Sequence, residues 1–395
     1  MHTLSQIGSI TSFGLRSIPQ RLGSVAAAMV GIAGVVAVLV GVLSIGSGFR
    51  RVMEASGSPD AAMVLRSGAD TEMSSNLSRE ETRLISDAPG VVHDGQTALS
   101  TAELFVVINL PKKSTGTDAN VPLRGVESAA VKVRDNLKIV QGRMFEWGKN
   151  EVMVGVGAAR EFAGLDVGKT MRVGRTDWSV VGVFSTAGGT AESEIWTDAK
   201  VLQGAYKRGD SFQSVAVKLK SPDSFQEFKD SITANPQLKV KVIRQTDYYA
   251  EQSQMMTSLV STLGYLIASL MAMGAVFGAL NTMYSSVSAR TREIATLRAL
   301  GFGRVAVVIS IMLESLVLAL VGGAIGAAVA YFVFNGFQTT TMNWQSFSQV
   351  TFAFAVTRQL LIQGIIWATL IGLIGGFLPA IRAARMPIAS ALREM

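Results

Sequence analysis

The sequence predicts an integral membrane α-helical protein with four transmembrane helices and a large α+β extracytoplasmic domain of two lobes. Three observations predict this class: four long apolar runs, one long polar segment between the first two runs, and an uneven distribution of charge. Hydrophobic residues make up 49% of the 395 residues and charged residues only 16%, against about 25% in a typical soluble domain.

The four apolar runs are each long enough to cross a bilayer, which takes about 20 mostly apolar residues. The first run, at 24–48, carries no charge, and the others cover 257–283, 305–334 and 359–381. We expect the first to be a retained anchor, because it is longer than the apolar part of a cleaved signal peptide and no convincing cleavage site follows.

Net charge predicts the orientation of the chain. The excess of 36 Lys and Arg over 29 Asp and Glu, +7 in all, lies in the segments 1–23, 284–304 and 382–395, whereas 49–256 is neutral. The positive-inside rule therefore places both termini in the cytoplasm, and 49–256 and the short loop 335–358 outside. The concentration of charge in these three segments, at low overall charge density, argues against a nucleic-acid partner.

The first 23 residues are predicted as a cytoplasmic segment at the membrane interface, because Leu4, Ile7, Ile10 and Phe13 recur every three residues. A disordered lead-in is the alternative.

The composition also limits the chemistry of this chain. It has no cysteine and only two histidines, His2 and His93, so thiolate or histidine metal sites and nucleophilic triads are not expected. The segment 163–170 loosely resembles a phosphate-binding loop, but a helical stretch precedes it and a strand follows, the reverse of the required order. The sequence therefore predicts no catalytic residue, no cofactor and no metal bound by this chain.

The outer segment is predicted to form two lobes. Segments 49–120 and 206–247 each contain a strand–helix–strand pattern and together form the first lobe, while 121–205 reads as an inserted β-rich lobe. In the first segment, Ser78 and Glu81 form a capping box that predicts a helix. In the second, Ser221 followed by Pro222 predicts the start of another helix.

The inner loop between the second and third spans is predicted to be a short helix over 288–301, with an apolar stripe, polar partners and a glycine at its end. It is either a basic loop that fixes topology at the lipid headgroups or a coupling helix that docks on a cytoplasmic partner. The candidate coupling residues are Arg290, Arg292, Glu293, Ile294, Leu297, Arg298, Leu300 and Gly301.

Two further features lie within the spans. Glu314 is a carboxylate about ten residues into the third run, where it either pairs helices or responds to protons. Pairs of glycines four residues apart allow helices to approach closely, and we weigh dimer contact and packing within one chain equally for them. These pairs are Gly274 and Gly278, Gly322 and Gly326, and Gly372 and Gly376.

Several motifs together resemble the MacB/FtsX type of ABC transporter permease. The segment after the second span reads Arg-Thr-Arg-Glu-Ile from Arg290, followed by Leu-Arg-Ala-Leu-Gly from Leu297. Glu314 precedes Gly322-Gly-Ala-Ile-Gly326, and the tail from Leu378 carries the family's proline, alanine and arginine pattern. The outer segment resembles the MacB periplasmic domain, as in Leu123-Arg-Gly-Val126 and Asp177–Gly182.

This resemblance implies a permease subunit of an exporter that transmits motion to its periplasmic domain without carrying substrate through the bilayer. It implies a separate cytoplasmic ABC ATPase that binds ATP and Mg²⁺, a second permease copy, contact with membrane lipid, a periplasmic adaptor, an outer-membrane channel and an inner-membrane location. A single helix from Asp247 to about Arg290, roughly 66 Å long, would suit this role. The alternatives are lipoprotein release of the LolC/LolE type and FtsX-like control of a cell-wall hydrolase.

Overall fold

The computed structural model describes residues 6–8, 10–12, 22–344 and 346–387. The chain divides into two compact units. The helical unit comprises the chain up to Ser47, 258–337 and the chain from Phe354 onward, and the sheet unit comprises 48–257 and 338–353. Leu4, Phe13 and the last eight positions of the predicted tail lie outside the described residues.

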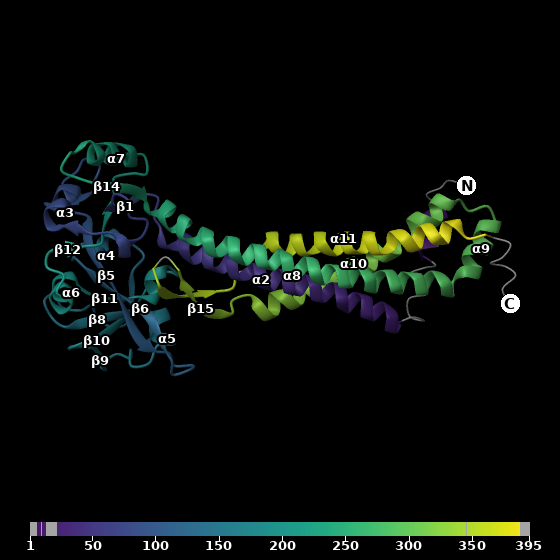
Figure 1. Cartoon of the computed structure of the whole chain (residues 1–395), viewed down its shortest axis with the longest axis horizontal. Coiled ribbons are helices and arrows are strands. Elements are labelled where there is room, and N and C mark those ends of the chain that lie inside the picture. Colours follow the sequence, from purple (N-terminus) through teal and green to yellow (C-terminus); the bar gives the residue numbers. More distant parts are fainter. Residues whose placement is uncertain (1–5, 9, 13–21, 345, 388–395) are drawn as a thin grey trace. The chain divides into compact units, whose positions relative to one another are not determined.

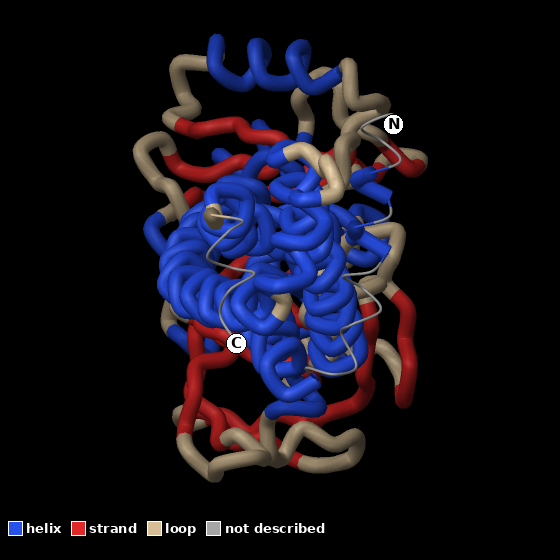
Figure 2. Tube along the Cα trace, turned by 90° about the vertical axis from the view of Figure 1, so that its right-hand side faces the viewer, coloured by secondary structure: helices blue, strands red, loops and turns tan. Residues whose placement is uncertain are grey.

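In the described part of the helical unit, four helices are long and apolar enough to cross a membrane, as the sequence predicts. Figure 1 labels them, and Figure 2 shows the helices nearly end-on. Each continues beyond its predicted apolar run, because polar residues extend the helices at their ends. They are α2 (Leu22–Ser56), α8 (Gln245–Ala289), α10 (Arg304–Phe334) and α11 (Arg358–Arg385), with the short α9 (Thr291–Ala299) between α8 and α10.

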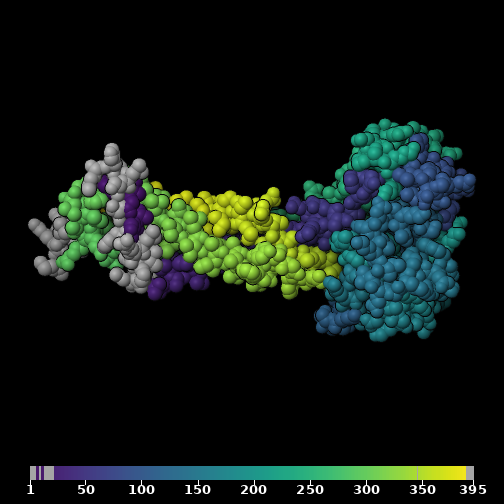
Figure 3. Space-filling view, turned by 180° about the vertical axis from the view of Figure 1, so that it is seen from behind, coloured from purple at the N-terminus to yellow at the C-terminus, as the bar shows by residue number. Residues whose placement is uncertain are grey.

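The centre of the helical unit is apolar. Val36 and Leu39 of α2 are fully buried together with Ala268 of α8 and Ala319 of α10. Figure 3 shows α10 (light green) and α11 (yellow) side by side along one face. Small side chains allow this packing, which brings helix backbones close together.

The described part of the N-terminal segment packs on the protein. Ile10 is 5% exposed and lies in a cluster with Ile294 of α9 and Val307 of α10. The Oγ atoms of Thr11 and Ser310 lie 2.8 Å apart. The apolar side of this segment therefore covers the α9 end of the helical unit.

The sheet unit contains a ten-stranded sheet in the order β14-β1-β13-β5-β6-β11-β8-β10-β7, with β9 also paired to β10. Its strands are β1 (Ala61–Arg66), β5 (Ser100–Pro111), β6 (Asp118–Val126), β7 (Lys138–Gly142), β8 (Glu151–Gly155), β9 (Thr170–Val173), β10 (Thr176–Ser185), β11 (Ile195–Asp198), β13 (Ser214–Lys218) and β14 (Val240–Arg244).

Shorter elements surround this sheet. The helices are α3 (Arg79–Ser86), α4 (Ala130–Val133), α5 (Val156–Glu161), α6 (Ala199–Tyr206) and α7 (Ser224–Ala234), with the 3₁₀ turns η2 (Glu72–Ser74) and η3 (Thr190–Ser193). Two-stranded pairs are formed by β2 (Leu77–Ser78) with β12 (Ser211–Phe212), β3 (His93–Asp94) with β4 (Thr97–Ala98), and β15 (Gln338–Asn343) with β16 (Ser348–Ala353).

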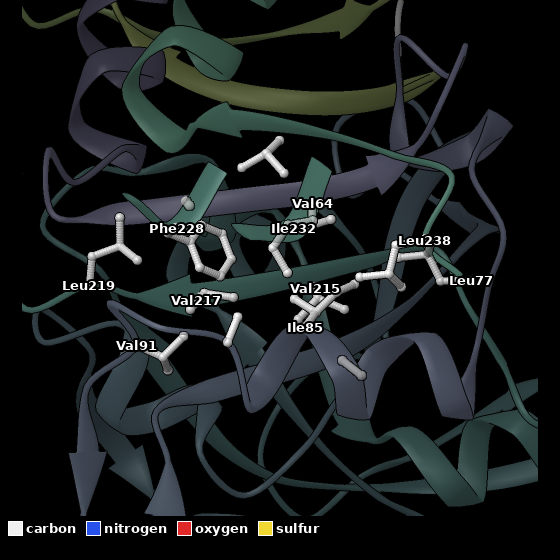
Figure 4. Close-up of a cluster of buried hydrophobic side chains, with 14 of the residues drawn as sticks. Val64, Leu77, Ile85, Val91, Val215, Val217, Leu219, Phe228, Ile232 and Leu238 are labelled. Atoms are coloured by element: carbon white, nitrogen blue, oxygen red, sulfur yellow. The ribbon is translucent and has the colours of Figure 1, made fainter. Parts of the chain in front are cut away.

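One part of the sheet is covered by α3 and α7. Figure 4 shows Ile85 of α3 and Phe228 and Ile232 of α7 directed toward Val215 and Val217 of β13. All five side chains are at most 1% exposed. Burying each such side chain contributes about 1.5–3 kcal/mol, and this core joins segments from both ends of the outer region.

A second core is built mainly from the inserted segment 121–205. It is formed by β6, β8, β10 and β11 with α5 and α6, and its fully buried side chains include Val154, Trp178 and Leu202. The two cores share one sheet, because β5 pairs with β13 through Ser100–Glu103 and with β6 through Leu104–Pro111. The polar stretch 111–120 is the turn and the flanking ends of the β5–β6 hairpin.

Of the two helix starts predicted in the first lobe, the structure confirms one and contradicts the other. The capping box at Ser78 is confirmed: its Oγ accepts from the Glu81 amide at 3.2 Å, and the Glu81 carboxylate accepts from the Ser78 amide at 2.8 Å. The predicted start at Ser221 is wrong. Residues 221–223 form a turn, the Ser224 amide donates to the Ser221 carbonyl at 3.1 Å, and α7 begins at Ser224.

The outer segment 335–358, expected as a short polar loop, contains the hairpin β15–β16, which belongs to the sheet unit. The Asn120 side chain donates to the Phe347 carbonyl at 2.7 Å, and the Thr351 amide donates to Ser193 at 2.9 Å. The aromatic rings of Phe49 and Phe352 meet edge to face at 5.7 Å. This hairpin is therefore attached to the sheet by specific polar and aromatic contacts.

Candidate functional site

The predicted coupling residues gather on and beside α9. Ile294 is 5% exposed and Leu297 is partly buried, and both lie in the apolar cluster at this end of the helical unit. Leu300 is 73% exposed. The apolar stripe thus divides, because its first two members hold α9 on the unit while Leu300 faces outward.

The polar residues of this segment divide in the same way. Arg292 and Glu293 are exposed, whereas Arg290 is only 8% exposed. Arg298 donates to the Met386 carbonyl at 2.7 Å, which ties α9 to the end of α11. The exposed side of α9 therefore presents Arg292 and Glu293, and the exposed Leu300 follows directly after the end of the helix.

The end of α9 follows the predicted form. Leu300 is the capping residue, and Gly301 follows with φ +95°, a conformation that glycine adopts without steric cost. The Gly301 amide donates to the Arg298 carbonyl at 3.1 Å.

Glu314 lies inside α10 and is 3% exposed. Arg290 Nη1 donates to its Oε2 at 3.0 Å, and Arg290 Nε donates to Glu293 Oε2 at 3.2 Å. The structure thus brings together two residues that the sequence analysis treats separately.

Four of the six predicted packing glycines contact neighbouring helices of the same chain. A β-carbon at Gly326 would lie 2.4 Å from the Ala33 carbonyl oxygen of α2, and one at Gly322 would lie 3.0 Å from that of Met29. At Gly372 and Gly376 it would meet Ala319 and Ser315 of α10. Within the described ranges, a β-carbon placed at Gly274 or Gly278 of α8 would have no atom of another helix within 4 Å.

A buried charge cluster in the sheet unit was not predicted. Arg124 of β6 is 3% exposed, and its guanidinium donates to carboxylates from three other parts of the chain at 2.7–3.0 Å. These are Glu72 on η2, Glu103 on β5 and Glu194 before β11. Arg134 adds two bonds to Glu103 at 2.6 and 2.9 Å.

The electrostatics of this cluster favour ionised groups. Burial alone would raise the pKa of Glu72, but the Arg124 charge, with hydrogen bonds from Arg124 and Ser214, holds that pKa below its ordinary value. Burial would lower the pKa of Arg124, but the surrounding carboxylates raise it well above its ordinary value. The cluster therefore links η2, β5, β6 and the residue before β11 through a network of ion pairs. Its sequence signal was a lone arginine in the otherwise apolar stretch Val121–Val126.

A small cavity adjoins this cluster. Glu72, Arg124 and Glu194 line it together with Gln252 of α8 and Asn343 of β15. The cavity has a volume of about 30 Å³. It can therefore hold ordered water but is too small for a drug-sized ligand. Gln252 accepts from the Asn343 side chain at 3.0 Å, so the start of α8 and the hairpin meet at this cavity.

The described residues contain no group of three or more His, Cys, Asp or Glu side chains arranged for a metal ion. Residues 163–169 connect α5 to β9, which begins at Thr170, so a helix precedes this stretch and a strand follows it, as the sequence analysis expects.

Comparison with known proteins finds two family models. The MacB-like periplasmic core domain matches residues 25–235, more than half of the chain, and the FtsX-like permease C-terminal model matches residues 265–388. These matches agree with the resemblance seen in the sequence.

Two curated relatives cover most of this chain. The macrolide export ATP-binding/permease protein MacB of Bdellovibrio bacteriovorus is 26% identical over 396 residues, which is 92% of this chain and 58% of that protein. The uncharacterised ABC transporter permease YknZ of Bacillus subtilis is 24% identical over 414 residues, with 98% and 97% covered. The chain thus spans about three fifths of the length of this MacB protein.

Solved structures give weaker matches. The extracellular domain of YknZ, a noncanonic ABC-type transporter from Gram-positive bacteria, has 17% identity and a TM-score of 0.36, covering 47% of this chain and all of that chain. The periplasmic region of MacB from Actinobacillus actinomycetemcomitans has 14% identity and a TM-score of 0.38, covering 51% and 95%.

The family matches account for both units: a membrane-embedded bundle and an α+β domain of the MacB periplasmic type. The chain belongs to the MacB/FtsX-type family of ABC transporter permeases.

Proposed function

We propose that this chain is the permease subunit of an ATP-driven ABC exporter of the mechanotransmission type. A separate ATPase subunit binds ATP and Mg²⁺ and docks on the exposed face of α9. A second permease copy completes the membrane assembly, and an adaptor and an outer-membrane channel are its further partners. Both termini lie in the cytoplasm, the bundle lies in the inner membrane among lipids, and the sheet unit lies in the periplasm.

The observation that carries this proposal is the length and placement of α8. It is one helix of 45 residues, roughly 67 Å long at 1.5 Å per residue, or about twice the hydrocarbon core of a bilayer. Its residues up to Thr257 belong to the sheet unit, and those from Ser258 belong to the helical unit. A continuous helix passes a displacement from one end to the other without a flexible linker.

The packing inside the helical unit supports transmission rather than passage of substrate through the bundle of one chain. Buried Val, Leu, Ile and Ala side chains fill its centre, and close glycine contacts join α2, α10 and α11. Lipoprotein release of the LolC/LolE type and FtsX-like control of a cell-wall hydrolase would use the same device with different partners.

Copurification of the tagged full chain from native membranes tests the proposal. We expect an ABC ATPase to copurify and to hydrolyse ATP. Leu300→Asp places a charge on the exposed apolar residue of α9, so we expect at least a tenfold loss of bound ATPase. Leu22→Asp is the matched control, because Leu22 is also exposed at 63% and begins α2, where an acidic residue suits the helix N-terminus.

The other copurifying proteins distinguish the alternatives. An adaptor and channel support efflux, a bound lipoprotein supports release, and a cell-wall hydrolase supports the FtsX-like role. The absence of any ATPase from the wild-type complex, or equal ATPase recovery with Leu300→Asp, would contradict the assignment of α9.

A further inference from the structure

Arg290 occupies the joint between two helices. It is the one residue between α8, which ends at Ala289, and α9, which begins at Thr291. Its guanidinium reaches Glu314 inside α10 at 3.0 Å and Glu293 in the first turn of α9 at 3.2 Å. One side chain therefore connects three consecutive helices where α8 passes into α9.

The partner in α10 is costly to bury. Glu314 is the only acidic residue in the sequence of α10, and its neighbours one turn away include Ile311 and Leu318, both buried. A buried carboxylate is strongly destabilising unless a cation and hydrogen bonds satisfy it. Because α10 fixes the position of Glu314, the ion pair also fixes the place of Arg290.

We propose that Arg290 and Glu314 form a positioning joint that sets the orientation of α9 relative to α10. A displacement of α9 then reaches α10 through this ion pair, in addition to reaching α8 through the backbone. Arginine suits this role because its planar fork binds two carboxylates at once, which the single ammonium of lysine does less well. The link to a bound ATPase rests on the proposed function, whereas the positioning of α9 does not.

Distance measurement on the full chain tests the joint. The chain contains no cysteine, so Thr296→Cys on α9 and Leu320→Cys on α10 can carry two spin labels in an otherwise unchanged protein. Both positions are exposed, Leu320 at 37%. Double electron–electron resonance in lipid nanodiscs, with labelled protein diluted by unlabelled copies, reports the α9–α10 distance.

We expect one narrow distance distribution in the protein with native Arg290 and Glu314. Arg290→Ala and Glu314→Ala should each broaden or shift it, and Arg290→Lys should do so to a smaller extent. Arg385→Ala, which removes an exposed arginine at the end of α11, is the control and should leave the distribution unchanged.

The double variant R290M/E314L distinguishes two effects of the ion pair: holding α9 in position relative to α10, and neutralising the buried charge of Glu314. It removes both buried charges and replaces them with apolar side chains of similar size, an exchange that proteins often tolerate. We expect its distribution also to be broader than the native one or shifted from it, because the link is gone. A distribution with the native width and mean distance in this double variant, or in Arg290→Ala, would overturn the proposal. If the single variants do not fold, the double variant still decides.

This experiment needs no ATPase. Unchanged distances would overturn the joint while ATPase copurification stood, and failed copurification would overturn the proposed function while the joint stood.

Discussion

Two arginine–carboxylate contacts in the sheet unit show how burial changes the effect of one residue. Arg124 is 3% exposed and holds Glu72, Glu103 and Glu194. Arg143 binds Glu151 through two bonds at 2.7 and 2.8 Å, but its side chain is 50% exposed. Water can replace Arg143 at its carboxylate, whereas little water reaches the carboxylates around Arg124.

We therefore expect Arg124→Met to destabilise the sheet unit by about 3–5 kcal/mol, because it leaves buried carboxylates without their main cation. This corresponds to a fall in its melting temperature of roughly 6–20 °C. Arg143→Met, the control, should cost less than about 1 kcal/mol. Thermal unfolding of the full chain, followed by tryptophan fluorescence, measures both, since Trp178 and Trp196 are fully buried. Equal shifts in the two variants would contradict the structural weight given to the cluster.

At the scale of the helices, glycines distinguish the faces of α10 and α11 from that of α8. Gly322, Gly326, Gly372 and Gly376 lie against α2 or α10 of the same chain. Gly274 and Gly278 sit on an exposed apolar face of α8 that includes Phe277, 70% exposed. The sequence analysis weighs packing within one chain against contact between two copies. The four glycines of α10 and α11 pack within the chain, and the pair on α8 is a candidate for contact with a second copy.

Alanine substitution should affect the stability of the chain differently at these two kinds of glycine. Gly326→Ala would push a methyl group against the backbone of α2, so we expect less folded protein and a lower melting temperature. Gly278→Ala should leave the fold of one chain unchanged or more stable by up to about 1 kcal/mol, the helix propensity difference. Copurification of two differently tagged copies then shows whether Gly278 contacts the second copy. Equal melting temperatures for both variants would contradict the close contact at Gly326.

At the scale of the whole chain, the distribution of charge and the division into units make one prediction about orientation. The exposed residues Leu300 on α9 and Arg175 in the turn between β9 and β10 belong to different units. If the basic segments face the cytoplasm, a membrane-impermeant maleimide should label Arg175→Cys in spheroplasts, and Leu300→Cys only after the membrane is opened. Labelling in the reverse order would invert the topology.

Much of this architecture could be predicted because its signals are local. Apolar length is sufficient to locate the four spans, and a capping box is sufficient to start α3. In the second segment of the first lobe, 206–247, a local signal gave a wrong prediction. Ser221-Pro222 has the residues of a helix start, yet the chain makes a turn there and the helix begins at Ser224.

The other features depend on partners distant in sequence. Arg124 meets Glu72 and Glu194, which lie 52 and 70 positions away, and no local pattern predicts that convergence. Arg290 and Glu314 lie 24 positions apart. The sequence analysis therefore singles out each residue but does not predict that they form an ion pair. The segment 335–358 was expected only as a short outer loop, because its attachment to the sheet depends on residues distant along the chain, such as Asn120 and Ser193.

The strand order of the sheet unit also dictates a sequence of events during biosynthesis. Strand β1 pairs with β13 and β14, as in Val64 with Val215 and Ala62 with Arg244, so it has no permanent neighbour until nearly all of the outer segment has been synthesised. Pairings so distant along the chain form slowly. Until then this part of the sheet is an unfinished, aggregation-prone edge, so the interval between synthesis of β1 and of β14 is when the nascent chain is most exposed to misfolding.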